Sequence, residues 1–273
     1  MNAAGTVAVV ACRDSEETID ACLTCLRAAA GVVEIRVVDC NSRDTTLAVV
    51  QRHAVADARV RFIANPDDPG YAVACNQGVA ASTTDWIALL QPGCMVERDS
   101  LSQLRDVAAA GDRLVGGDVV DEQDASDPAS RLRLADPAGA VWWAWLGFAA
   151  CAPTQEPEQE VDAVGGGVLL LSRSRFDALG GLDTGYATRI AQLDLCRRGC
   201  AAGATVVCAN SVRIRRVRGL LARVHPVLLA WRQRHDATRF WRIHGSRQRL
   251  ASAWLRVWLG FPLALVRALA RMH

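Results

Sequence analysis

Apolar and polar positions follow a repeating block pattern over the first hundred residues of the chain. Residues 6–11 form a continuous apolar run, which is typical of a strand buried on both faces. The next apolar side chains, Ile19, Cys22, Leu23 and Leu26, recur with the spacing of one helix face. The chain therefore begins with a predicted strand followed by a predicted amphipathic helix.

The same order continues along this first part of the chain. Further strands are expected at 34–38, 60–63 and 86–90, and further helices at 45–53 and 72–81. Because strand–helix–strand crossovers are right-handed, this alternation gives a parallel sheet whose ligand site lies beyond the carboxyl ends of the strands. We therefore predict an α/β fold with a Rossmann-like, mostly parallel central sheet and flanking helices.

Helix boundaries carry local signals. The segment Asp14-Ser15-Glu16-Glu17 has the form of a capping box for the first helix, and Gly31 suits its end. Asp44 precedes the second helix, where its carboxylate could act as an N-cap.

Residues 118–160 interrupt the pattern with acidic side chains and prolines, and 141–148 form an aromatic knot. We interpret the acidic stretch as a solvated surface insertion, with a binding role as the alternative. The tryptophans of this segment cannot all face one way. Partly exposed aromatic surface for a ligand or a lipid and simple core packing are therefore both open. A further strand is expected at 168–171.

The last 28 residues, 246–273, combine apolar side chains with arginine. Their uninterrupted apolar run, 257–266, is about half of the ~20 residues that a spanning helix needs. Tryptophan and arginine flanks favour an amphipathic helix in the membrane interface, and packing onto the domain is the alternative. We expect one domain over 1–245, made of two halves at 1–100 and 101–245.

Composition narrows the setting. The 273 residues carry a net charge of only +2, which argues against a nucleic-acid partner, and all 31 basic residues are arginine. Arginine is concentrated after Arg197, which suggests contact with phosphates or an anionic membrane face. Ten scattered cysteines, with Cys22-x-x-Cys25 lacking a second pair for zinc, indicate thiols in a reducing cytosol. Residues 1–12 lack the basic start of a signal peptide, so we expect a cytoplasmic protein.

Five motifs carry the chemistry, in a consistent order along the chain. They are VVDCNSRDT at 37–45, DDPGYAVACNQG at 67–78, DWIALL at 85–90, LQPG at 90–93, and GGLD at 180–183 with LDLCRR at 193–198. They resemble VVDNxSxDGT, ENxGFAxAxNxG, GDYVLLL, LNPD and GGFDE…EDVDLCWR of the inverting family 2 glycosyltransferases, in the rhamnosyltransferase-like branch. The resemblance spans about 6–245. No GxGxxG follows the first strand, which disfavours a plain dinucleotide-binding domain.

This resemblance implies a GT-A fold, a UDP- or dTDP-sugar donor, a saccharide or lipid-linked acceptor, and Mg²⁺ or Mn²⁺. It also implies that 1–100 form a nucleotide-binding half and 101–245 an acceptor half. In the family the residue at Asp39 meets the pyrimidine and the following loop reaches the ribose. An aspartate can also accept from a pyrimidine imide N–H, although a strand-end turn is an alternative role for Asp39. The positions implied at the nucleotide are Ala11, Asp39, Asn41, Ser42, Asp44, Asp68, Gly70, Asn76, Gln91 and Gly93.

The chain departs from the family where catalysis is expected. The family's general base falls at Gln192 and its metal-binding carboxylate at Gly93. Neither an amide nor glycine supplies a charged oxygen for a proton or a divalent cation.

Two explanations stay open. One is a catalytically inactive pseudo-glycosyltransferase that acts as a scaffold in a polysaccharide assembly complex. The other is metal-free transfer, in which Arg215, Arg216 and Arg218 pair with the diphosphate in place of a cation. Asp183 is then the candidate base, and Asp194 is less suited because it lies roughly 200° around the helix from the family's base position. In either case we expect a cytoplasmic protein, peripheral on the inner face of the cell membrane.

Overall fold

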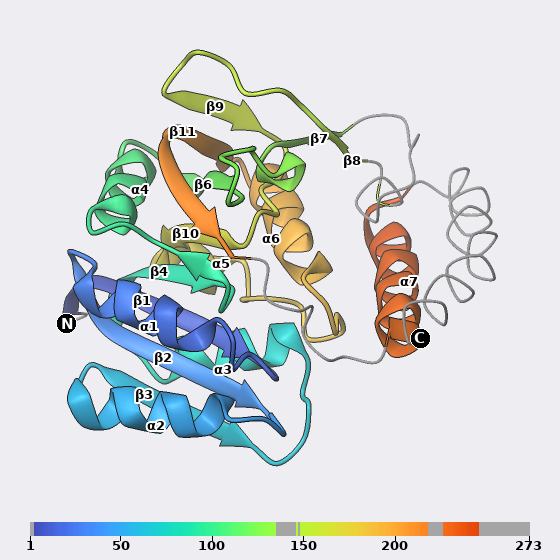
Figure 1. The fold of residues 1–273 in the computed structure, drawn as a ribbon. Helices are drawn as coiled ribbons and strands as arrows, with labels where there is room; N and C mark the ends of the chain where they lie inside the picture. The colour runs from blue at the N-terminus through green and yellow to red at the C-terminus, as the bar shows by residue number, and fades with distance from the viewer. Residues whose placement is uncertain (1–2, 135–145, 147, 218–225, 246–273) are drawn as a thin grey trace.

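The computed structural model describes residues 3–134, 146, 148–217 and 226–245. Strands and helices alternate from the N-terminus, and Figure 1 shows them wound around one central sheet. The elements are, in chain order, β1 (Ala3–Cys12), α1 (Ile19–Ala28), β2 (Val32–Cys40), α2 (Thr46–Ala56), β3 (Val60–Asn65), α3 (Tyr71–Ala80), β4 (Thr84–Leu90), β5 (Cys94–Met95), α4 (Ser100–Ala109), β6 (Arg113–Val120), η1 (Pro128–Ser130), β7 (Leu132–Leu134), β8 (Phe148–Ala150), β9 (Glu158–Val161), β10 (Val168–Ser172), α5 (Arg173–Ala178), α6 (Ile190–Ala201), β11 (Thr205–Arg216) and α7 (Pro226–His244).

The main sheet has the strand order β3-β2-β1-β4-β10-β6-β11-β5, with β9 added beside β11. Strands β1 to β4 run parallel, as predicted, and β10 inserts antiparallel between β4 and β6. Strand β11 runs parallel to β6 and antiparallel to β5 and β9. The predicted mostly parallel α/β sheet with flanking helices is therefore confirmed.

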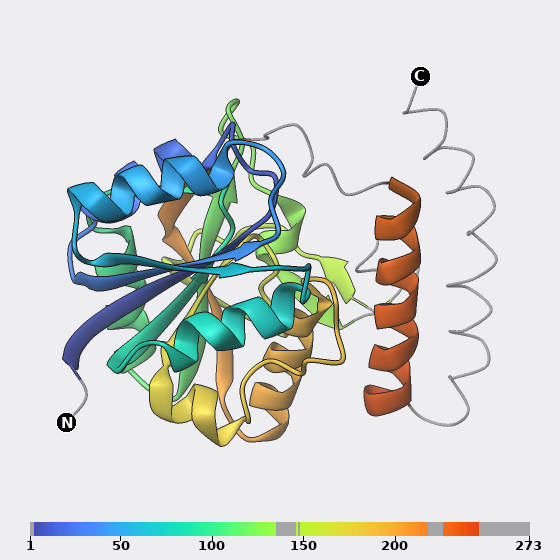
Figure 2. The same cartoon turned by 90° about the horizontal axis from the view of Figure 1, so that it is seen from below.

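Helices cover both faces of the sheet (Figure 2). Alternate residues of β1 divide between two cores: Val7 and Val9 pack with α3, α5 and α6, whereas Ala8 and Val10 pack with α1, α2 and α4. The whole β1 run from residue 5 to 10 is buried, which explains why its sequence is continuously apolar.

The predicted capping box at the start of α1 is wrong. Helix α1 begins at Ile19 behind Thr18, and Thr18 makes no side-chain cap hydrogen bond. Instead, the Asp14 carboxylate accepts from the N–H of Arg43 at 2.7 Å, and the Glu16 carboxylate accepts from the N–H of Thr45 at 3.2 Å. These acidic residues join the β1–α1 loop to the β2–α2 loop.

The acidic stretch after residue 118 is only partly a solvated insertion. Asp118 belongs to β6, is 5% exposed and pairs with the buried Arg131 at 2.9 Å. Asp124 is exposed as expected, while Asp127 is largely buried against Arg216. The tryptophans of the aromatic knot lie outside the described residues.

Helix α7 lies beside α6 at the edge of the α/β body (Figures 1 and 2). Within the described ranges, α7 and the other helices are each too short or too polar to cross a membrane. The predicted tail, 246–273, lies outside the described residues. All ten cysteines are free thiols, and none of them is exposed.

Candidate functional site

The parallel strands β1, β2 and β4 end at the same edge of the sheet, and the predicted nucleotide positions follow these ends. Asp39 lies at the end of β2, two residues after the buried Val37. Asp68 and Gly70 follow β3, and Gln91 follows β4 directly. The structure therefore brings these motifs together at the place where open α/β sheets bind ligands.

The Asp39 carboxylate shapes its own loop. It accepts from the N–H of Ser42 at 3.0 Å and from the Ser42 hydroxyl at 2.5 Å, and the Asp39 residue is 2% exposed. Asn41, inside this turn, has a φ of 59°. Asp39 thus stabilises a turn at the end of β2, which is one of the two roles considered from the sequence; the other was contact with the pyrimidine base.

Asp44 holds the next part of this loop. Its carboxylate accepts from the N–H of Thr46 at 2.9 Å and from the N–H of Glu16 at 3.1 Å. Burial opposes ionisation of Asp44, but these hydrogen bonds outweigh it and lower the pKa of the carboxyl. Helix α2 starts at Thr46, one residue later than predicted, and the Asp44 side chain supports that start.

Asp68 is held by arginines from two distant segments. Its carboxylate pairs with Arg13, at the end of β1, and with Arg232 of α7 at 2.5 Å. Burial opposes ionisation, yet the Arg232 and Arg13 charges lower the pKa of Asp68. Gly70, whose φ of 87° suits glycine, donates its N–H to Asp68 at 3.2 Å and leads into α3.

Two predicted nucleotide positions make packing contacts. The Asn76 amide donates to the Leu182 carbonyl at 2.8 Å and accepts from the Leu182 N–H at 3.0 Å. Asn76 therefore fixes the GGLD turn against α3. Ala11 is half-buried in a small apolar cluster with Val38 and Ala74.

The residues at the family's metal position do not fit a divalent cation. A Cβ on Gly93 would lie 2.9 Å from the Val217 carbonyl oxygen, and the Val217 N–H donates to the Gly93 carbonyl at 3.0 Å. The backbone at the end of β11 thus fills the space that a carboxylate side chain would need. Among the residues that the structure describes, His, Cys, Asp and Glu form no group of three that could hold a metal ion.

The family's base position is a buried, hydrogen-bonded amide. Gln192 is 1% exposed. Its carbonyl oxygen accepts from the Tyr71 hydroxyl at 3.4 Å, and its amide donates to the Val164 carbonyl at 3.3 Å. Gln192 therefore links α6 to α3 and to the segment between β9 and β10.

Both carboxylates that the sequence offered as substitute bases are engaged by arginine. Asp183 receives three hydrogen bonds from Arg239 of α7, at 2.8, 2.9 and 3.1 Å. Asp194 is 1% exposed and pairs with Arg198 and His244, each at 2.7 Å. Burial opposes ionisation of Asp194, but His244 and Arg198 lower its pKa. Neither carboxylate is a free proton acceptor in this arrangement.

Helix α7 supplies residues that the motifs did not indicate. Asp236 is fully buried and accepts from the N–H groups of Ala187, at 3.2 Å, and Thr188, at 2.7 Å. With Arg232 on Asp68 and Arg239 on Asp183, α7 holds the loop before α6 against the strand ends. The sequence signal that could have indicated these α7 residues is the run of charged side chains at 232–239, R-x-R-H-D-x-x-R.

The structure separates the predicted diphosphate arginines. Arg215 and Arg216 are adjacent in β11, so their side chains point to opposite faces of the sheet. Arg215 is 55% exposed and pairs with Asp124 at 3.1 Å, whereas Arg216 is 23% exposed and pairs with Asp127. Arg218 lies outside the described residues. The pairing of Arg215, Arg216 and Arg218 with a diphosphate stays a prediction, and in this arrangement Arg215 and Arg216 lie on opposite faces of β11.

Arg189 is a candidate site residue that the sequence motifs did not indicate, and it lies near Cys94, Arg216 and Asp127. It immediately precedes α6 and is half-buried. Burial lowers the pKa of its guanidinium, and the nearby charge of Arg216 acts in the same direction. The Arg189 carbonyl accepts from the N–H of Gln192 at 3.0 Å, but in the described part of the chain its side chain forms no hydrogen bond and no ion pair.

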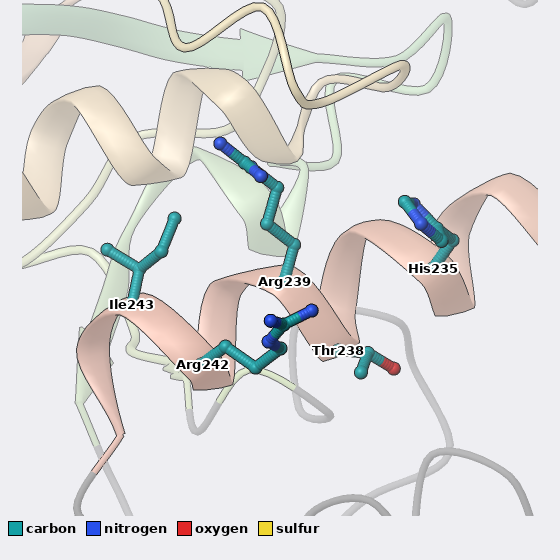
Figure 3. A pocket seen from close by; sticks show the side chains of 5 residues that line it. All are labelled: His235, Thr238, Arg239, Arg242 and Ile243. Atoms are coloured by element: carbon teal, nitrogen blue, oxygen red, sulfur yellow. The ribbon is translucent and has the colours of Figure 1, made fainter.

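A separate pocket of about 410 Å³ lies along α7 (Figure 3). The pocket is lined by a basic face of α7, and the Arg239 side chain points from this face towards α6. The lining residues are His235, Thr238, Arg239, Arg242 and Ile243. None of them follows a strand of the main sheet, so this pocket is distinct from the strand-end site.

Comparison with known sequences agrees with this architecture. The profile described as "Glycosyl transferase family 2" matches residues 6–172, which is more than half of the chain. The chain belongs to glycosyl transferase family 2. One curated relative of this family 2 chain is the succinoglycan biosynthesis protein ExoO of Rhizobium meliloti (strain 1021), which is 37% identical over 114 residues. That match covers 41% of this chain and 32% of ExoO, so the chain aligns with about one third of its relative.

Solved structures share the fold of this family 2 chain. GalNAc-T7 with UDP, GalNAc and Mn²⁺ superposes with a TM-score of 0.65 at 13% identity, over 80% of this chain and 44% of that one. The mannosyltransferase PcManGT from Pyrobaculum calidifontis, with GDP-Man and Mn²⁺, gives 0.62 at 16% identity, over 97% and 73%. Residues 1–349 of TarS from S. aureus give 0.60 at 10% identity, over 95% and 80%. The predicted GT-A fold is confirmed.

Proposed function

We propose that this chain is a glycosyltransferase of cell-surface polysaccharide biosynthesis. Its donor is a UDP- or dTDP-sugar, and its acceptor is a saccharide or a lipid-linked saccharide. The observation that carries the proposal is the gathering of Asp39, Asp68, Gly70 and Gln91 at the carboxyl ends of the parallel strands. Family membership supports glycosyl transfer, and the similarity to the succinoglycan biosynthesis protein ExoO supports polysaccharide synthesis.

The donor binds without a divalent cation in this proposal. Gly93 is crowded by the Val217 carbonyl, and the charged groups around that position are Arg216, Arg189 and Asp127, with arginine in the majority. Guanidinium groups pair with phosphate oxygens in a fixed two-pronged geometry. Such pairing can stabilise the charge that develops on the leaving diphosphate.

A non-catalytic scaffold is the second candidate function. The observation that favours it is the burial of Gln192 together with the engagement of Asp183 and Asp194 by α7 and α6. Loss of a general base costs ~10²–10⁴-fold in rate, so a scaffold and a slow transferase differ in turnover rather than in fold.

We place the protein in the cytoplasm, peripheral on the inner face of the cell membrane. Residues 246–273 carry arginine and tryptophan among apolar side chains, which suits an interfacial helix. A lipid-linked acceptor would then be presented at the same surface.

The deciding experiment is titration calorimetry with UDP and dTDP, run with Mn²⁺ and again with EDTA. Equal binding in both buffers is the expected result, and it leads to a screen for sugar release and transfer. Binding without any turnover would favour the scaffold. Absence of binding in both buffers would contradict the proposed donor class.

A further inference from the structure

The family's cation position has more positive than negative side chains around it in this chain. The buried Cys94 follows Gly93 directly, and its surroundings include the charges of Arg216, Arg189 and Asp127. Two guanidinium groups and one carboxylate leave this cluster with one uncompensated positive charge. A site built for a divalent cation has the opposite balance.

Of the two arginines in this cluster, only Arg216 has an ion-pair partner among the described residues. Asp127 neutralises Arg216, and it also accepts from the N–H of Ala129 at 2.9 Å. Arg189 has no such partner among the described residues, although burial penalises its charge. Keeping a half-buried cation unpaired costs free energy, so it calls for a ligand that compensates the charge.

A second polar group at the same place is unpartnered. The amide nitrogen Nε2 of Gln91 is buried and has no hydrogen-bond partner in the described structure. Gln91 occupies the strand end that precedes the family's metal carboxylate, and a Cβ on Gly167 would lie 2.8 Å from this nitrogen. An amide N–H₂ donates, so its missing partner is an acceptor such as a phosphate oxygen.

We propose that Arg189, with Arg216 and the Gln91 amide, binds the diphosphate of the donor in place of a metal ion. The inference rests on the proposed function for the nucleotide part of the ligand. Arg189 supplies the free charge, Arg216 is shared between Asp127 and the ligand, and Gln91 donates one hydrogen bond. Arginine stays protonated at neutral pH even when burial lowers its pKa, so this site holds its charge without a metal.

The test measures UDP and inorganic pyrophosphate binding by calorimetry in EDTA, on the full chain and two variants of Arg189. Arg189→Gln removes the charge. Arg189→Lys keeps the charge but loses the planar guanidinium group that donates two parallel hydrogen bonds. Arg197→Gln is the matched control, since it removes the same charge from α6 about 12 Å along the helix. We expect Arg189→Gln to weaken both ligands at least ~10-fold, Arg189→Lys to weaken them less, and Arg197→Gln to change them less than ~2-fold.

Thermal unfolding separates this role from a structural one. Removing an unpaired, half-buried charge should leave the melting temperature of Arg189→Gln unchanged or raised, while a supporting residue would lower it. Unchanged affinity of Arg189→Gln for both ligands would overturn the inference while leaving the proposed function standing. Pyrophosphate binding that needs Arg189, without any UDP or dTDP binding, would overturn the proposed donor and keep the inference. Failure of the wild-type chain to bind either ligand would overturn both.

Discussion

Gly93 occupies the position where the family has a metal-binding carboxylate, and its surroundings exclude a larger residue. We expect Gly93→Asp to create no Mn²⁺ affinity, because its Cβ would lie 2.9 Å from the Val217 carbonyl oxygen. The substitution should instead lower the free energy of unfolding by about 1–3 kcal/mol, as overpacking does. Mn²⁺ titration and denaturant unfolding of the variant measure the two effects.

Gly111→Asp is the control for this substitution. A Cβ at Gly111 meets Arg113 at an ordinary 3.5 Å, so the same chemical change there should cost little stability. Mn²⁺ binding by the Gly93→Asp variant at wild-type stability would contradict the proposed reason for the lost metal site.

Single residues also show which features could be predicted from the sequence and which could not. Ile19, Cys22, Leu23 and Leu26 were predicted to share a buried face, and all four are fully buried, because local periodicity decides which helix face is apolar. The partners of Asp183 and Asp194 could not be predicted in this way. Arg239 and His244 lie about 50 residues further along the chain, and only the packing of α7 brings them close.

At the scale of elements, Asp194 joins α6 to α7 through Arg198 and His244. The pKa of Asp194 is lowered in the folded protein, so its ionised form contributes stability above the unfolded value of about 4. That contribution is lost as pH falls through the lower folded pKa. We expect Asp194→Asn to lose about 3 kcal/mol at pH 7 and less near pH 3, because it breaks a buried ion pair.

Urea unfolding of wild type and Asp194→Asn between pH 3 and 8 measures this difference. Asp106→Asn serves as the control, since Asp106 is 74% exposed and pairs only loosely with Arg105 at 3.7 Å. A stability difference that grows towards low pH would contradict the assigned direction of the Asp194 shift.

Element positions were predicted best where the order is local. The strands and helices of the first hundred residues follow from alternating apolar blocks, and the structure has each of them within a few residues. The placement of β10 between β4 and β6, and the pairing of β5 with β11, depend on long-range contacts. For this reason the sequence grouped Arg215 with Arg216, although β11 turns them to opposite faces, and it gave no reason to single out Arg189.

At the scale of the whole molecule, α7 connects the two halves of the domain. Arg232 holds Asp68 in the predicted nucleotide-binding half, while Asp236 and Arg239 hold the loop before α6 in the other half. The division at residue 100 remains a prediction, because one sheet runs through both halves. Helix α7 is therefore linked to the strand-end site by side-chain contacts. The predicted tail follows α7 directly in the chain, so a membrane contact of the tail would lie next to this helix in sequence.

The tail supplies the prediction at this scale. Residues 246–273 contain five arginines (247, 249, 256, 267 and 271) and no acidic residue, so their formal charge is +5. Each arginine near an anionic surface contributes about 1 kcal/mol, and the attraction weakens as salt rises. We expect the full chain to sediment with vesicles containing one third phosphatidylglycerol, and the chain truncated after Gly245 to stay in the supernatant.

Two further measurements identify the cause of sedimentation. Replacing Arg256, Arg267 and Arg271 together with glutamine keeps the apolar residues and removes three of the five charges, so it should reduce sedimentation with anionic vesicles. Vesicles of phosphatidylcholine alone should bind the wild-type chain less than anionic ones, since they lack the surface charge that attracts arginine. Undiminished sedimentation of the truncated chain would mean that the membrane contact lies within residues 1–245, where the basic face of α7 would be the next surface to test.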